Sequence, residues 1–181
     1  MSGGKESQME GRGGTYESNR AESVRKLGEL VKGIRIAMLV TRSGDGSLRA
    51  RPMAAQETDF DGTVWFFTAQ HSSKVDELVR NPEVGLVYAD ASGHRYVSLS
   101  GRAALVRDAV KARELWSPLY REWFPKGLED PELALLRIEV TRAEYWDSPG
   151  MLGMVGKLFA GFTGEIHEAE QTEAMHGTVR L

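Results

Sequence analysis

The sequence predicts a mainly β fold with peripheral helices (α+β), in which six antiparallel strands surround one core. Two observations lead to this class. The middle of the chain alternates short apolar segments with turns rich in Gly, Asn and Asp, which is typical of consecutive antiparallel strands. Segments with helical periodicity are fewer and lie around the strands. Closure into a small barrel is favoured, because it leaves few exposed strand edges.

The composition indicates one globular domain without membrane or nucleic-acid partners. The chain has 181 residues, of which 41% are hydrophobic and 27% charged, and its net charge is −3, whereas nucleic-acid binding usually requires a basic surface. The absence of cysteine excludes disulfides, cysteine nucleophiles and thiolate metal sites. The four histidines are scattered, so we expect no metal site. Neither a secretory signal nor a membrane span is evident, so we expect a cytoplasmic protein.

The N-terminal part predicts a tail followed by a helix. Residues 1–17 are rich in Gly, Ser and Glu and lack apolar periodicity, which is typical of a disordered tail. From Ser18 a helix is favoured, and Gly33 stands where its C-terminal cap belongs. Apolar or small residues recur there at spacings of three and four, namely Val24, Leu27, Gly28 and Val31.

The strands follow in order, separated by turns. We expect strands at residues 34–41, 47–58, 63–68, 84–89, 95–106 and 135–146. Gly101 lies inside the fifth of these strands. A glycine there indicates a bulge or the sharp bend that a barrel corner needs.

Two helices are expected between the strands, and a third after them. The first is capped by Ser72 or Ser73, and its apolar stripe consists of Val75, Leu78 and Val79. The second begins at Asp108 and reaches Leu119. After Pro149, apolar residues recur at near-helical spacing among glycines, so this segment needs the barrel or a second subunit to pack on. The expected organisation is a tail (1–17), a domain (18–149) and a C-terminal helical extension and tail (150–181).

One strand carries two arginines on the same face. Strand periodicity places Arg49, Arg51 and Met53 together, and neighbouring arginines repel unless an anion lies between them or solvent screens them. Pro52 removes a ladder donor, so this point is an edge or a bulge. These residues alone are compatible with a solvated edge strand or with half of an anion site.

A second polar signal lies where a strand passes into a helix. Free N–H groups at a helix start favour anions, Ser72 and Ser73 add hydroxyls, and Lys74 adds a cation. Simple helix capping explains the serines equally well. Together with Arg51 on a neighbouring element, the pattern indicates a phosphate site, in which charge-assisted hydrogen bonds contribute roughly 1.5–3 kcal/mol each.

Four motifs together resemble those of the pyridoxamine 5′-phosphate oxidase-like FMN-binding split barrels, in particular their general stress protein branch. They are R-x-R-P-M at Arg49–Met53, W-F-F-T with a following S-K at Trp65–Lys74, Y-V-S-L-S-G at Tyr96–Gly101, and A-E-Y-W-D at Ala143–Asp147. The resemblance runs from about Arg25 to Pro149. It implies an antiparallel six-stranded split β-barrel of the FMN-binding type, and a homodimer with FMN at the subunit interface.

The resemblance also implies a role in cofactor binding for nine residues. Ser73, Lys74 and Arg51 would hold the phosphate, and Phe67 and Thr68 would offer backbone contacts to the flavin ring. The remaining members would lie near the ring, with Tyr96 contributed by the other subunit. The full set is Arg51, Pro52, Met53, Phe67, Thr68, Ser73, Lys74, Tyr96 and Trp146. Tyr96 as an ordinary strand residue and Trp146 as a core aromatic stay open as alternatives.

Two departures argue against pyridoxamine phosphate oxidation itself. The vitamin-forming oxidases carry a lysine where Gln56 stands, and an R-x-H element after the tryptophan where this chain has Asp147, Ser148 and Pro149. Both elements grip the substrate in those enzymes. A later aromatic group, consisting of Trp116, Tyr120, Trp123 and Phe124, could line a ligand mouth or pack a helix on the barrel.

The sequence therefore predicts an FMN-binding general stress protein whose redox chemistry, for an unknown substrate, lies in the flavin. No general acid or base can be named. Two alternatives stay open. One is a stress protein that holds FMN without enzymatic turnover, and the other is a relative that binds a deazaflavin or haem in the same cleft.

Overall fold

The fold is built around one antiparallel sheet. The computed structural model describes residues 10–56, 58–147 and 175–181. Within them, the strand order is β2-β1-β4-β5-β6-β3, with β7 paired to β6, and every ladder is antiparallel. The strands are β1 (Ile36–Arg42), β2 (Leu48–Ala54), β3 (Thr63–Ala69), β4 (Glu83–Asp90), β5 (Arg95–Val106), β6 (Leu133–Asp147) and β7 (Met175–Arg180).

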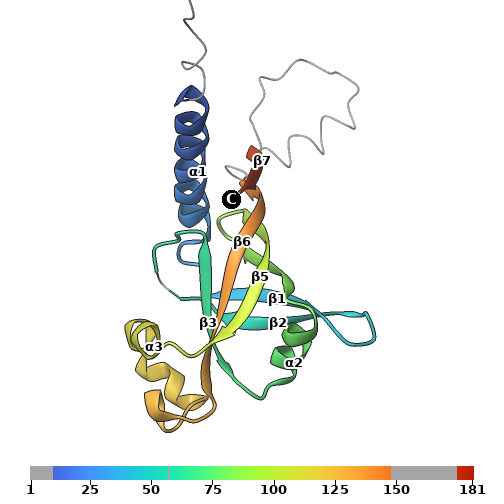
Figure 1. Ribbon diagram of the computed structural model, residues 1–181, viewed down its shortest axis with the longest axis vertical. Helices are drawn as coiled ribbons and strands as arrows, with labels where there is room; N and C mark the ends of the chain where they lie inside the picture. The colour runs from blue at the N-terminus through green and yellow to red at the C-terminus, as the bar shows by residue number, and fades with distance from the viewer. Residues whose placement is uncertain (1–9, 57, 148–174) are drawn as a thin grey trace, which may run out of the picture.

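The sheet curls into a barrel that stays open. In Figure 1, β1 and β2 run across the direction of β3, β5 and β6. β2 and β3 end the strand order and contact each other, yet no ladder joins them in the described part of the chain. This open antiparallel arrangement confirms the expected split-barrel fold.

A bulge in the longest ladder produces part of this curl. The register between β5 and β6 shifts between Ser100 and Gly101, as the sequence predicts. A Cβ at Gly101 would lie 2.4 Å from the carbonyl oxygen of Glu139, so β6 approaches closely enough that only glycine fits. Beyond the bulge β6 leaves β3 and pairs with β7 instead.

Helices cover the ends and one side of the sheet. They are α1 (Glu10–Val31), α2 (Ser73–Arg80) and α3 (Ala109–Leu115), with two 3₁₀ turns, η1 (Pro118–Glu122) and η2 (Gly127–Glu129). α1 contacts β5 and extends beyond the sheet (Figure 1), whereas α2 contacts β1 and β5. The α3–η2 region lies over β3, where Leu115 and Phe124 pack on Phe67.

The main core lies on the inner face of the sheet. Cross-strand residues Leu39, Leu86 and Leu99 are at most 1% exposed and are covered by Leu27 of α1. A second cluster of buried residues lies on the outer side of β3, around Phe67 and Leu135. The candidate site described below lies where β2, β1 and α2 meet at the rim of the main core.

Two helices differ from their expected bounds. α1 begins at Glu10, not at Ser18, because a helix that is already nucleated extends through polar residues without an apolar face. α3 ends at Leu115, not at Leu119, because the ring of Pro118 disfavours helical backbone in the preceding residue. Asp108 caps α3 as expected, and its carboxylate accepts from the amides of Val110 and Lys111.

The C-terminal region contains a strand that the sequence did not predict. Residues 175–180, assigned to a tail, form β7 along the edge of β6 that β3 leaves unpaired. The helix expected between residues 151 and 162 lies outside the described residues. No described helix combines the length and apolarity that crossing a membrane requires.

Candidate functional site

A buried carboxylate with two arginines and a threonine forms the centre of the site. Glu77 of α2 is 4% exposed. Its Oε2 accepts from Thr41 Oγ1 at 2.6 Å and from Arg51 Nη2 at 2.7 Å, and its Oε1 accepts from Arg49 Nη1 at 3.3 Å. Thr41 is 1% exposed. The hydrogen bond from the Thr41 hydroxyl is the largest single cause that lowers the pKa of Glu77, and the two arginines lower it further, so this carboxyl stays ionised.

Local sequence patterns bring these side chains together. Arg49 and Arg51 alternate with outward residues on β2, and they lie opposite Thr41 and Leu39 of β1 on the inner face. On α2, the spacing of three between Lys74 and Glu77 places both on one side of the helix. The rim of the barrel therefore carries three cations around one buried anion.

Lys74 lies close to this group. Its Nζ donates to the hydroxyl of Ser72, the N-cap residue, at 3.1 Å. Burial lowers the pKa of Lys74, and the positive charge of Arg51 lowers it further, whereas Glu77 partly opposes both effects. The structure therefore places Lys74 and Arg51 in one electrostatic environment, with Ser73 as the first residue of the same helix.

Arg51 has a donor that the protein leaves unused. Its Nη1 is buried and has no hydrogen-bond partner among the described residues. Buried donors are nearly always paired in native proteins, so an orphaned one needs an explanation. An anion between Arg51 and Lys74 would supply the missing acceptor, and the residues present therefore fit a phosphate group.

The next four predicted residues lie on the strands that flank the opening of the barrel. Pro52 and Met53 belong to β2, and Phe67 and Thr68 belong to β3. Each strand ends the sheet order, so each has one edge without a strand partner in the described residues. On facing strand edges, unpaired backbone N–H groups can donate hydrogen bonds to a planar ring and unpaired carbonyl groups can accept hydrogen bonds from it. The side chains of Met53 and Phe67 are buried and serve packing.

Tyr96 and Trp146 lie elsewhere in the same chain. They are direct cross-strand partners on the outer face of β5 and β6, 41% and 42% exposed. Arg51 points to the inner face. Cross-strand pairing leads from Arg51 through one residue each of β1 and β4 to Leu99 of β5. Tyr96 lies three residues along β5 from Leu99, which is about 10 Å. β5 itself lies three strands from β2, which is about 14 Å across the sheet. The structure does not bring this pair to the cations within one chain.

Gln56 lies beyond β2, under an aromatic group. Its Nε2 donates to the Tyr120 hydroxyl at 2.7 Å and to the carbonyl oxygen of Ala54 at 3.3 Å. The Tyr120 ring lies 4.7 Å from that of Phe67, and Trp116 contacts both rings. The aromatic group therefore packs on β3, as one of the two interpretations expected, and it also holds Gln56.

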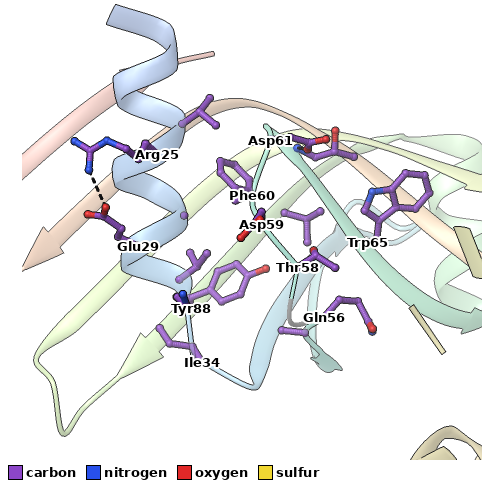
Figure 2. Close-up of a pocket in the computed structure, with 18 of the residues that line it drawn as sticks. Arg25, Glu29, Ile34, Gln56, Thr58, Asp59, Phe60, Asp61, Trp65 and Tyr88 are labelled. Atoms are coloured by element: carbon purple, nitrogen blue, oxygen red, sulfur yellow. Dashed lines mark hydrogen bonds and ion pairs between the residues drawn. The ribbon is translucent and has the colours of Figure 1, made fainter. Parts of the chain in front are cut away.

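A large pocket lies apart from these residues. It has a volume of about 1160 Å³ between α1, the segment after β2 and the start of β3, and Gln56, Phe60, Trp65 and Tyr88 are among its lining residues (Figure 2). Arg25 on its rim is paired with Glu29 at 2.7 Å. None of the nine residues predicted to bind the cofactor lines it. Size alone therefore does not identify the site.

Sequence reasoning missed Glu77 and Thr41. It placed Val79 on the apolar stripe of α2, but Val79 is 80% exposed and Glu77 is turned inward instead. The two arginines of β2 attract the carboxylate, and this attraction outweighs apolar periodicity. Two weak signals were available. Neighbouring arginines on one strand face are stabilised by an anion between them, and Glu77 stands three residues after a lysine of the same helix.

Comparisons with known proteins agree with this fold. The family model described as pyridoxamine 5′-phosphate oxidase like matches residues 22–169. The general stress FMN/FAD binding protein of Xanthomonas citri is 30% identical, with a TM-score of 0.62, over 72% of this chain and 92% of that one. A Clostridium acetobutylicum protein related to general stress protein 26 is 19% identical, with a TM-score of 0.63, over 91% of this chain and 96% of that one.

A curated fungal relative is matched as well. Protein bli-3 of Neurospora crassa is 26% identical over 134 residues. The match covers 68% of this chain and 64% of the fungal protein, so the chain spans a little less than two thirds of the length of that relative.

Proposed function

Because the chain belongs to the pyridoxamine 5′-phosphate oxidase-like family, we propose that it binds FMN through the phosphate at the cation group of β2 and α2. The unused Nη1 of Arg51 is the observation that carries the proposal. Arg49, Arg51 and Lys74 contribute three positive charges and Glu77 one negative charge, which leaves a net charge of +2. A phosphate monoester carries about −1.5 to −2 at neutral pH, so it would neutralise the site.

The flavin ring would extend from the phosphate along the opening between β2 and β3. The residues around Pro52 and Met53 on one edge, and Phe67 and Thr68 on the other, supply backbone groups there. Ser73 would add its hydroxyl and the amide at the start of α2. The similarity to a Xanthomonas citri protein described as FMN/FAD binding supports a flavin as the ligand.

The proposed assembly is a homodimer formed through the outer face of the sheet. Exposed apolar side chains continue across neighbouring strands of this face, including Ile36, Met38, Val87, Tyr96 and Trp146. Exposed apolar side chains grouped on one face are typical of an interaction site. In a dimer, Tyr96 and Trp146 of each chain would reach the flavin held by the other, which accounts for their distance from Arg51.

The redox chemistry would come from the flavin, which accepts and donates electrons when bound. The residues described here bind and orient the ligand, and none is placed as a general acid or base. We therefore propose a flavin-dependent redox protein of unknown substrate and a member of the general stress group, with an FMN-dependent oxidoreductase as the first candidate. Gln56 favours the second candidate, an FMN-holding protein without turnover, because its amide is already bound to Tyr120 and Ala54.

Purified protein tests the ligand first. We expect a yellow protein whose absorbance is that of a flavin, and whose released chromophore has the mass of FMN. Release of FAD would mean that the site binds a diphosphate and not a phosphate monoester. Release of a deazaflavin or haem would favour the alternative of a family relative that binds that ligand in the same cleft. Rapid oxidation of a flavin-reducing donor with a defined acceptor would distinguish an enzyme from an FMN-holding protein.

A double substitution tests the phosphate site. In Arg51→Ala/Lys74→Ala, FMN affinity should fall by about a hundredfold or more, because charge-assisted hydrogen bonds contribute about 1.5–3 kcal/mol each. Riboflavin affinity should hardly change, since riboflavin lacks the phosphate. Quenching of flavin fluorescence measures both. The control is Arg113→Ala/Lys126→Ala, which removes the same charge from exposed positions outside the sheet. Equal losses for both ligands would refute the proposed role.

A further inference from the structure

We propose that Glu77 is a positioning residue for phosphate recognition, which holds the Arg51 guanidinium so that its free edge faces the ligand. This inference rests on the proposed function. Glu77 is buried and would not itself touch the ligand. Its effect would be to give the site a preference for flavins that carry a phosphate monoester.

The geometry around Glu77 supports this role because all its partners are donors. Thr41 and Arg51 donate to Oε2, and Arg49 donates to Oε1. Thr41 comes from β1, the arginines from β2 and Glu77 from α2. The carboxylate therefore joins the strand that carries the arginines to the helix that carries Lys74, and it fixes the distance between the two halves of the cation group.

The guanidinium of Arg51 gains a defined orientation from this contact. An arginine side chain has about 2 kcal/mol of rotamer entropy, but its planar group is fixed once one edge is bound. Nη2 is held by Glu77 at 2.7 Å, and Nη1 of the same plane is buried without an acceptor among the described residues. A ligand that meets this donor finds it already oriented, which reduces the cost of binding.

An opposing effect has to be weighed. A carboxylate near a bound phosphate repels it, so removing the charge of Glu77 could tighten binding. However, two arginines and a hydroxyl already compensate this carboxylate, and the group keeps a net charge of +2 with Glu77 included. We therefore expect orientation of Arg51 to outweigh repulsion.

Glu77→Gln separates the two effects. Glutamine has nearly the same shape but only one acceptor oxygen, and its amide nitrogen would face donors. FMN affinity should fall about tenfold or more, the loss expected from one charge-assisted hydrogen bond, whereas riboflavin affinity should stay within twofold. Thr41→Val, which removes one buried donor to Glu77, should shift FMN affinity in the same direction by less. Fluorescence quenching, with circular dichroism to verify folding, measures these effects.

A double variant and a matched control complete the experiment. In an Arg51→Ala background, Glu77→Gln should weaken FMN binding no further, because the residue it positions is gone. Glu29→Gln breaks a comparable Glu–Arg pair at the surface of α1, 2.7 Å from Arg25, and should change neither affinity. Tighter FMN binding by Glu77→Gln, or equal losses of FMN and riboflavin, would overturn the inference while leaving the proposed function intact. A wild-type chain that does not bind FMN would overturn both.

Discussion

At Lys74 the requirements of ligand binding oppose those of folding. Burial and the charge of Arg51 lower the pKa of this lysine, so the folded protein holds the proton less tightly than the unfolded chain does. A charged Lys74 therefore costs stability at neutral pH, and stability rises with pH between the folded and unfolded pKa values. A bound phosphate would remove that cost, which is the arrangement expected of a binding site and not of a structural ion pair.

Lys74→Met should consequently change stability and affinity in opposite directions. The methionine keeps the length of the side chain and removes the charge, so the thermal unfolding midpoint of the ligand-free protein should rise slightly. FMN affinity should fall about tenfold or more through loss of a charge-assisted contact. Differential scanning fluorimetry and fluorescence quenching measure the two quantities. Lys126→Met, at an exposed lysine, should alter neither, and a destabilised Lys74→Met protein would contradict the argument.

The arginines of β2 show how far residue-scale reasoning reaches. Their spacing is compatible with solvent screening or with an anion between them, and the structure shows that the protein supplies an anion as Glu77. The spacing alone does not say which anion is the partner, because Glu77 is 26 residues from Arg51 and pairing at that separation depends on tertiary packing. The same spacing says nothing of Nη1 of Arg51, since an orphaned donor is visible only when all its neighbours are known.

At the scale of elements, the β5–β6 ladder depends on one glycine. Gly101→Ala would place a Cβ 2.4 Å from Glu139 O and 3.0 Å from the Cγ2 of Ile138, and the first of these is backbone that cannot move aside cheaply. We expect a loss of about 1–3 kcal/mol, and hence a drop of several degrees in the unfolding midpoint. Gly85→Ala is the control, because its Cβ would meet Val40 at an ordinary 3.6 Å. Equal unfolding midpoints for the two variants would show that the β6 backbone moves to accommodate the added Cβ.

Elements were predictable where local signals determine them. The β5 bounds and its bulge, the Asp108 cap and the Gly33 terminus follow from turn and cap chemistry, and the structure confirms them. β7 was not predictable, because residues 175–180 pair only since the bulged β6 leaves an edge free. The start of α1 depends on helix extension through polar residues, and the end of α3 depends on Pro118. Apolar periodicity predicts neither of these two boundaries.

At the scale of the whole molecule, the two faces of the sheet have different roles. The inner face encloses the core and holds the cation group at its rim, whereas the outer face presents apolar side chains to solvent in the single chain. Of the residues predicted as one site, Arg51 therefore lies on the inner face, whereas Tyr96 and Trp146 lie on the outer face. In the proposed homodimer, a second chain seated on the outer face would bring them together, so ligand binding and assembly should be coupled.

Val87→Arg tests that coupling at the centre of the outer face. Val87 is 39% exposed and pairs with Met38 and Ser98, so arginines there would meet in the proposed interface. The wild-type chain should have a native mass near twice 20.0 kDa, and the variant should be monomeric by light scattering. Riboflavin and FMN affinities should fall together, because a lost partner removes ring contacts and leaves the phosphate site. Val110→Arg, at a 75% exposed valine of α3, should change neither the native mass nor the flavin affinities. A wild-type chain that is monomeric and still binds FMN would refute the proposed homodimer.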